Sequence, residues 1–311
     1  MSAWSRRGLR IRGAAFLVVT AGIANGIAAD LTKAANAQAT NKRELHFGIM
    51  LDTVPGKGSL MEKFKMIKEA GFEGVEPSSG LDRSKVLKAR DASGLLIPSV
   101  CCSTHWSKPL SHPDPAVRAE GLEGLKIALR DAKAYGASSV LLVPAVVNAD
   151  VSYADAYRRS QEEIRKAIPL AGELGVKIAL ENVWNGFLLS PLEAARYVDE
   201  LNSPAIGWQF DVGNIINYGW PEQWIVVLGP RIQKLHIKEF SRAKRDKEGL
   251  WKGFAVDYLE GDNNWPAVMR ALDTVGYHGW AIAEPGWNPP DVEPLVRLQQ
   301  ILVKMKQINS L

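Results

Sequence analysis

The sequence predicts an α/β protein built as one (β/α)8 barrel of the TIM type. The chain has 311 residues, and strand-like and helix-like segments alternate from residue 45 to its end. No long linker or internal repeat interrupts this alternation. A barrel of this type commonly forms one domain of about 250 residues. We therefore expect a single barrel domain over residues 45–311.

The expected strands are short apolar runs, such as SSVLLVP and VKIALE. Unbroken apolar runs are typical of parallel strands, because helices cover both faces of a parallel sheet. The shortest run is EGVE. The eight expected ranges are 45–51, 73–76, 95–101, 138–144, 176–181, 205–211, 232–237 and 279–284.

The expected helices lie between these strands and carry their own start and stop signals. Ser190 and Pro191 form an N-cap followed by a first-turn proline. Several helices stop at a glycine, which readily adopts the left-handed conformation that ends a helix. The expected ranges are 59–70, 116–135, 153–174, a helix starting at 190–191, 221–228, 265–275 and 291–308.

The N-terminal segment 1–37 resembles a twin-arginine export signal. It begins with the basic sequence SRRGL, continues with an apolar stretch and closes with the small residues ANA. A Sec signal and an uncleaved anchor are the alternatives, but Asn25 and several small residues make the stretch a poor permanent span. We expect export to the periplasm, a flexible leader over 38–44, and no stable membrane span after signal removal.

Charge excludes nucleic acid as a partner. The chain has 38 Lys and Arg against 34 Asp and Glu. Segment 1–37 holds five of these basic residues and one acidic residue, so the remainder has 33 of each. A near-neutral domain lacks the basic face that binds nucleic acid.

Cys101 and Cys102 are adjacent on one expected strand and point to opposite faces, so we expect buried free thiols rather than a disulfide.

Four ligand-type side chains stand at or near the ends of four consecutive expected strands. They are Glu181, Asp211, His236 and Glu284. The C-terminal strand ends of a (β/α)8 barrel meet at one rim, where the active site lies. Clustered buried carboxylates need a cation to neutralise them. Three oxygen ligands and one nitrogen, without a thiolate, predict one divalent ion, with Mn²⁺ favoured and Mg²⁺ or Co²⁺ as alternatives.

This site predicts chemistry on an α-hydroxy ketone. A divalent ion that holds two vicinal oxygens stabilises the enediolate formed when the intervening proton leaves. Glu181 and Glu284 are the candidate base and acid. We expect an isomerase or epimerase whose substrate is a small keto-sugar or cyclitol. A homo-oligomer is compatible with the sequence.

Four motifs resemble the xylose isomerase-like barrel superfamily, and within it the sugar phosphate isomerase/epimerase type. They are ENVW (181–184), FDVGN (210–214), LHIKEF (235–240) and AEP (283–285). The resemblance covers about residues 45–305. It implies that the four residues above bind a divalent metal and that the two glutamates move a proton.

Two positions depart from the ketose 3-epimerase pattern. Phe187 stands where those enzymes carry a glutamate that holds the O1 region of the substrate, and Asn214 stands where they carry a histidine. A metal-dependent lyase or hydratase acting on a 3-keto-glycoside is therefore the alternative, and a non-catalytic sugar-binding protein is a second one.

The remaining candidates are polar and aromatic residues close to the expected strand ends. The expected substrate contacts are Lys238, His105, Trp106, Glu76, Asn182 and Asn214. A structural role is the alternative for Glu76. The basic segment 242–247 is expected to be a loop, either a phosphate site or a solvated surface. Export favours a non-phosphorylated substrate.

Overall fold

The computed structural model describes residues 43–311. The expected export signal and most of the expected leader lie outside the described residues. Arg43 and Glu44 are part of the barrel rather than of a flexible leader. The Arg43 guanidinium donates to Asp273 Oδ2 (2.6 Å) and to the carbonyl oxygen of Asn309 (2.7 Å). The backbone N–H of Glu44 donates to His278 Nδ1.

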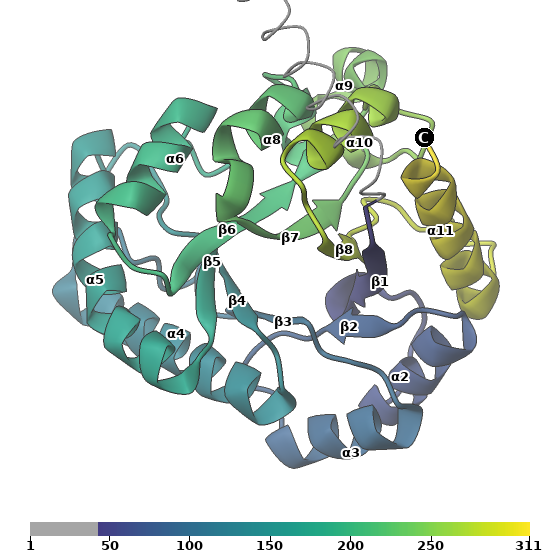
Figure 1. Ribbon diagram of the computed structural model, residues 1–311, viewed down its shortest axis with the longest axis horizontal. Helices are drawn as coiled ribbons and strands as arrows, with labels where there is room; N and C mark the ends of the chain where they lie inside the picture. Colours follow the sequence, from purple (N-terminus) through teal and green to yellow (C-terminus); the bar gives the residue numbers. More distant parts are fainter. Residues whose placement is uncertain (1–42) are drawn as a thin grey trace, which may run out of the picture. The chain divides into compact units, whose positions relative to one another are not determined.

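Eight parallel strands form a nearly closed barrel in the order β2-β1-β8-β7-β6-β5-β4-β3 (Figure 1). The strands are β1 (Leu45–Met50), β2 (Gly74–Glu76), β3 (Ser99–Cys101), β4 (Ser139–Leu142), β5 (Lys177–Glu181), β6 (Ile206–Asp211), β7 (Ile232–Ile237) and β8 (Gly279–Ala283). Two isolated parallel bridges, Gly74 with Leu96 and Ser78 with Cys101, connect β2 toward β3. The predicted (β/α)8 architecture is confirmed.

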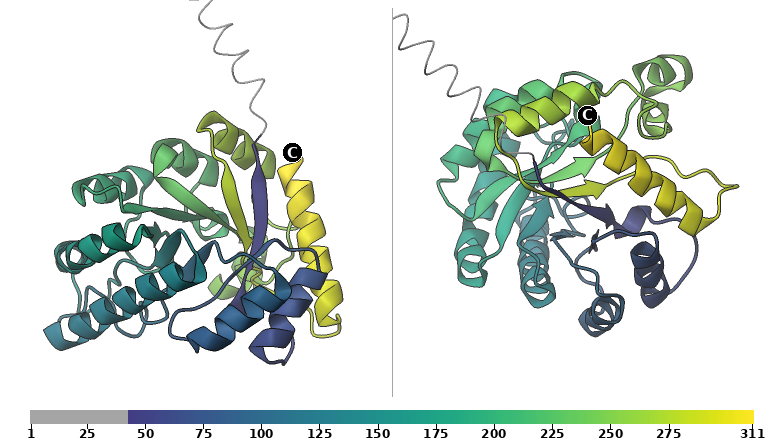
Figure 2. Two further views of the ribbon diagram at one scale, coloured as in Figure 1. Left: turned by 60° about the horizontal axis from the view of Figure 1, so that its bottom comes forward. Right: turned by 45° about the vertical axis from the view of Figure 1, so that its right-hand side comes forward.

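Helices surround the barrel, as Figures 1 and 2 show. The α-helices are α2 (Leu60–Glu69), α3 (Arg83–Ser93), α4 (Pro115–Tyr135), α5 (Tyr153–Leu174), α6 (Pro191–Glu200), α7 (Val212–Ile216), α8 (Pro221–Leu228), α9 (Arg242–Glu248), α10 (Trp265–Thr274) and α11 (Pro294–Asn309). Three short 3-10 helices are η1 (Leu51–Thr53), η2 (Gly229–Arg231) and η3 (Leu250–Phe254). Among residues 43–311, no helix is both long and apolar enough to cross a bilayer.

Three α-helices, α3, α7 and α9, have no counterpart among the expected helix ranges. The sequence assigns no range to α3, since this helix buries just two side chains, Val86 and Ala89. The basic segment 242–247 forms helix α9 instead of a loop. Ser241 caps its first turn by accepting a hydrogen bond from the backbone N–H of Lys244. No side chain of α9 is buried, so apolar periodicity cannot reveal it.

Strand register brings the ligand-type residues to the same end of the barrel. Glu181 pairs with Gln209 across β5 and β6, and Asp211 pairs with His236 across β6 and β7. The backbone N–H of Glu284, one residue past β8, donates to the carbonyl oxygen of Ile237. The C-terminal rim therefore holds these side chains close together, as expected for the active end of this fold.

Candidate metal centre

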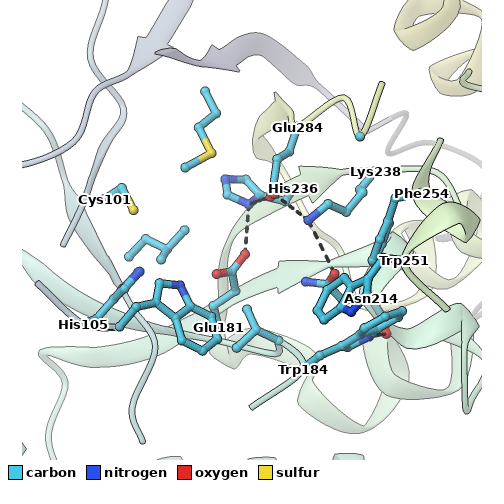
Figure 3. A pocket seen from close by; sticks show the side chains of 15 residues that line it. Cys101, His105, Glu181, Trp184, Asn214, His236, Lys238, Trp251, Phe254 and Glu284 are labelled. Atoms are coloured by element: carbon cyan, nitrogen blue, oxygen red, sulfur yellow. Dashed lines mark hydrogen bonds and ion pairs between the residues drawn. The ribbon is translucent and has the colours of Figure 1, made fainter. Parts of the chain in front are cut away.

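The four predicted ligands converge on one point. One ligand atom each from Glu181, Asp211, His236 and Glu284 lies within 4.8 Å of the others. Asp211 and His236 are fully buried, Glu181 is buried, and Glu284 is half-buried. Figure 3 shows Glu181, His236 and Glu284 directed toward one another. Three carboxylates and one imidazole in this arrangement match the ligand set of a single divalent ion.

His236 presents one ring nitrogen to this cluster. Its Nδ1 lies 3.0 Å from Glu181 Oε1 and 2.8 Å from Glu284 Oε2. Its Nε2 lies 2.7 Å from Glu76 Oε2, on the opposite side of the ring. A carboxylate on the far nitrogen fixes the ring and its tautomer, as commonly seen behind metal-binding histidines. Nδ1 is then the nitrogen available to an ion.

Glu76 supports the centre from behind and does not face the cavity. Its carboxylate accepts hydrogen bonds from Gln209 Nε2 (2.9 Å) and from the Ser99 hydroxyl, and it is fully buried. Burial alone would raise its pKa, but His236 and these hydrogen bonds outweigh burial and lower it. The structure favours the structural role that the sequence left as the alternative for Glu76, because three protein groups already use this carboxylate.

Asp211 carries the feature that best fits a cation. Its Oδ1 accepts a hydrogen bond from the backbone N–H of Asn214 (2.7 Å), but its buried Oδ2 accepts none from residues 43–311. Lys238 Nζ lies 3.3 Å from Oδ2, an ion pair without hydrogen-bond geometry. Burial raises the pKa of Asp211 to about 7. A buried carboxylate oxygen without a hydrogen bond is rare in proteins and is satisfied when it coordinates a metal.

Lys238 adds a positive charge beside the carboxylates. Its Nζ lies 2.5 Å from Glu284 Oε1 and 3.4 Å from Asn214 Oδ1. Burial of Lys238 opposes its charge, but Asp211 and Glu284 outweigh burial and raise its pKa. Lys238 is therefore an ammonium group.

The environment separates the two candidate proton carriers. Burial raises the pKa of Glu181. Burial acts in the same direction on Glu284, but Lys238 and His236 outweigh it and lower the pKa of that carboxyl. Two nearby carboxyl groups with pKa values pushed apart are typical of an acid–base pair.

A cavity of about 360 Å³ opens above the cluster, within the range of about 300–1,000 Å³ usual for small-molecule sites. Its apolar and aromatic lining comprises Met50, Leu141, Val183, Trp106, Trp184, Trp251 and Phe254. Its polar lining comprises Cys101, His105, Glu181, Asn214, His236, Lys238 and Glu284. Lys238, His105, Trp106 and Asn214 thus lie where the sequence places substrate contacts.

Asn182 holds two strand ends together and is absent from this lining. Its Oδ1 accepts from Trp208 Nε1 (3.0 Å) and from the backbone N–H of Asp211 (3.1 Å). Its Nδ2 donates to the carbonyl oxygen of Asp211 (2.7 Å). Both ends of its amide thus bind strand β6, which gives Asn182 a structural role in place of the expected position in the cavity wall.

His105 is a neutral hydrogen-bond donor in the cavity wall. Its Nδ1 accepts a hydrogen bond from the backbone N–H of Val143 (3.2 Å), so Nε2 carries the proton of the neutral ring. Burial lowers the pKa of His105 to about 4. The adjacent Trp106 is half exposed and packs edge-on against it, with ring centroids 5.8 Å apart.

We expect His105 to make folding stability depend on acidity. In the unfolded chain the His105 imidazole takes up a proton near pH 6.5, whereas in the folded protein burial lowers its pKa to about 4. Stability is thus lost as pH falls through this window, by up to about 3 kcal/mol. His105→Gln should flatten this loss of stability in urea unfolding measured at pH 4 to 7. Equal slopes for wild type and His105→Gln would contradict this assignment.

Phe187 and the basic helix α9 do not face the cavity. Phe187 is buried against Tyr153 and Tyr197, with ring centroids 5.2 and 5.6 Å away. Arg242 donates to the carbonyl oxygens of Ile216 (2.9 Å) and Gly219 (3.2 Å). Lys244 donates to the carbonyl oxygen of Ala255 (2.6 Å), and Arg245 donates to Asn217 Oδ1 (2.9 Å). These basic groups hold loops together and form no phosphate site in the cavity.

Sequence reasoning missed several residues of the site, among them Gln209 and Phe254. Gln209 donates to Glu76, and Phe254 forms part of the cavity wall. Gln209 had a usable signal, since it lies two residues before Asp211 and points to the same side of strand β6. Phe254 lies in η3, a segment without periodicity, so no sequence signal places it.

Comparisons with known proteins agree with this geometry. A family model of the xylose isomerase-like TIM barrel matches residues 64–302. L-ribulose-5-phosphate 3-epimerase UlaE of Escherichia coli is 26% identical over 266 residues, which cover 81% of this chain and 90% of that protein.

Solved structures show the same fold. D-allulose 3-epimerase from Methylomonas sp. superposes with a TM-score of 0.70 at 19% identity, covering 86% of this chain and 98% of the other. The 3-keto-D-glucoside 4-epimerase YcjR from E. coli gives a TM-score of 0.70 at 16% identity, covering 86% and 100%. These named relatives are sugar epimerases. The family model spans most of the chain, and the protein belongs to the xylose isomerase-like TIM barrel family.

Proposed function

We propose that this protein is a divalent-metal-dependent sugar epimerase or isomerase that acts on an α-hydroxy-ketone unit. The convergence of Glu181, Asp211, His236 and Glu284 within 4.8 Å, below a cavity with polar and aromatic walls, carries the proposal. The activities of the three relatives named above, which are sugar epimerases, support the reaction class.

The four clustered residues would hold the ion, with Glu76 fixing the ring of His236 from behind. When bound, a divalent ion acts as a Lewis acid that polarises the ketone and favours loss of the neighbouring proton. The buried Oδ2 of Asp211 supports this assignment, since it has no hydrogen-bond partner in the part of the chain that the structure describes.

Glu181 and Glu284 are the proposed proton carriers. Epimerisation breaks one C–H bond next to a ketone and remakes it from the opposite face, so it needs a base and an acid on two sides of the carbon. Both glutamates line the cavity, and their ligand atoms lie within 4.8 Å of each other. One glutamate removes the proton, and the other returns it.

Lys238 and His105 are the proposed donors to substrate oxygens. The Lys238 ammonium stands beside Glu284, where it would donate to a substrate oxygen on which negative charge develops as the proton leaves. The Nε2–H of neutral His105 belongs to a ring that lines the cavity. A preorganised donor on each oxygen of the α-hydroxy-ketone unit would stabilise the charge without reorganising solvent.

The proposed substrate carries no phosphate. Among the described residues that line the cavity, Lys238 is the one Lys or Arg, and it is already paired with Glu284. A phosphate needs additional cations or a helix N-terminus directed at it. We further propose that the protein works outside the cytoplasm, as its N-terminal sequence leads us to expect.

Deuterium exchange tests the proposed function. The purified protein, loaded with Mn²⁺ and incubated in D₂O with ketoses, inososes and 3-keto-glycosides, is expected to exchange a substrate C–H and to form a new stereoisomer. The NMR signals of exchange should disappear when a chelator removes the ion and return when Mn²⁺ is restored. The rate of C–H exchange should depend on the metal ion, because the buried carboxylates cannot polarise a ketone themselves.

Three other outcomes would change the assignment. Exchange with release of an alcohol would identify the lyase that the sequence leaves as the alternative. Exchange that survives complete chelation would contradict metal dependence. No exchange by protein with demonstrably bound metal, across the whole panel, would favour the non-catalytic sugar-binding alternative.

A further inference from the structure

The lining of the cavity includes two exposed tryptophans. Trp106 is 50% exposed and Trp251 is 68% exposed, and both line the cavity. Large exposed aromatic side chains at the rim of a cavity are typical of a binding surface. Neither ring is needed to enclose the metal-ligand cluster, since those ligands lie deeper and are mostly buried.

One wall of the cavity is a continuous aromatic surface that leads outward from the cluster. Lys238 Nζ lies 5.1 Å from the centroid of the Phe254 ring. The Phe254 and Trp184 centroids are 4.7 Å apart, and the Trp184 and Trp251 centroids are 5.0 Å apart. Figure 3 shows these three aromatic residues grouped on the side of Lys238. Phe254 and Trp184 are half-buried and Trp251 is exposed, so exposure increases toward solvent.

On the opposite wall of the cavity, side-chain exposure likewise increases from His105 to Trp106. His105 is 7% exposed, and the adjoining Trp106 is half exposed. Figure 3 places His105 across the cavity from Phe254 and Trp251. A ligand that extends from the cluster toward solvent thus meets a polar inner zone first and aromatic rings second.

We propose that this mouth is a second-sugar subsite, in which Trp251 and Trp106 hold the distal ring of a disaccharide-sized glycoside. The inference rests on the proposed function, with the reacting ring at the cluster. A pyranose has an apolar C–H face that stacks on aromatic rings and hydroxyl edges that stay hydrated, which suits a half-open mouth. No Lys or Arg among the described residues lines this outer zone, which disfavours a charged distal group.

A ligand that fills the second-sugar subsite restricts the chemistry of the reacting ring. A glycosidic bond locks the anomeric carbon, so the reacting ring cannot open to a linear ketose. The α-hydroxy-ketone unit must then lie within the ring, with a ketone carbon next to a carbon that bears hydrogen and hydroxyl. Proton removal to one glutamate and return from the other leaves the glycosidic bond intact. The substrate class is therefore a keto-glycoside with two rings.

The test compares two substrates that share the reacting ring. Methyl 3-keto-β-glucopyranoside and 3-ketocellobiose differ in the group on the anomeric oxygen, a methyl group in one and a glucose ring in the other. For the Mn²⁺-loaded full chain, kcat/KM for C–H exchange should favour 3-ketocellobiose about tenfold, mainly through KM. Trp251→Ala should reduce this preference ratio about tenfold. Trp220→Ala removes an exposed tryptophan outside the cavity lining and should retain it.

Equal kcat/KM values for the two substrates would overturn the subsite, as would a Trp251→Ala effect of equal size on both. Failure of exchange with both substrates would instead count against the proposed function. Titration calorimetry with cellobiose and methyl β-glucoside, neither of which carries a ketone, then decides the subsite on its own. Tighter cellobiose binding that Trp251→Ala removes would support it, and equal or absent binding of the two would contradict it.

Discussion

Replacing Glu284 with Gln is expected to reduce C–H exchange about 10³-fold. Glutamine keeps the size of the side chain but cannot accept or return a proton, and general acid–base groups contribute about 10²–10⁴-fold to rate. The change also removes the negative charge that lies 2.5 Å from Lys238 Nζ. Exchange rates measured at saturating Mn²⁺, with bound metal quantified in the same sample, separate loss of proton transfer from loss of the ion.

The control for this substitution is Glu260→Gln. Glu260 is an exposed carboxylate that pairs with Lys304 and lies outside the cavity lining. The Glu260→Gln variant should catalyse C–H exchange at the wild-type rate. A Glu284→Gln variant that binds metal and still exchanges at more than about a tenth of the wild-type rate would exclude Glu284 as a proton carrier. Glu181→Gln, measured in the same way, then shows whether both glutamates are required.

The rim position of the site could be predicted from the sequence, because apolar runs end at Glu181 and Asp211 and parallel strands all end on the same side. The sequence could not predict which of these side chains face the cavity and which lie behind it. Glu76 and Asn182 also stand at strand ends, but Glu76 lies behind His236, and Asn182 spans to Asp211. Both positions depend on partners far away in sequence, 160 residues in the case of Glu76 and His236.

The same limit explains the errors in the outer structure. Helix α9 carries the composition of a solvated loop, and its basic side chains bind backbone carbonyls that appear only once α7 and η3 are placed. The cavity wall likewise combines Trp184 after β5 with Trp251 and Phe254 from η3. Composition indicates aromatic and basic segments, but tertiary contacts decide which of them reach the substrate.

We expect the buried polar residues below the site to act by positioning a metal ligand and not by transferring a proton. Glu76, Gln209 and Ser99 form a buried hydrogen-bonded group, and among the described residues its side-chain hydrogen bonds reach the cluster at His236 Nε2. Glu76 has no face toward the cavity, so it cannot touch the substrate. Any effect of Glu76 on catalysis must therefore pass through the orientation and basicity of the His236 ring.

We expect Glu76→Gln to weaken Mn²⁺ binding about 10–100-fold in calorimetric titration, as is usual for groups that orient a metal-binding histidine. Excess Mn²⁺ should restore most of the exchange rate, whereas it should not rescue Glu284→Gln. Glu239→Gln is the matched control: Glu239 is equally buried on the same rim, but it binds Trp265 Nε1 and the backbone of Leu259 instead of His236. It should leave Mn²⁺ affinity unchanged. If Glu76→Gln bound Mn²⁺ like the wild type, or if saturating Mn²⁺ failed to restore exchange, Glu76 would not act by positioning His236.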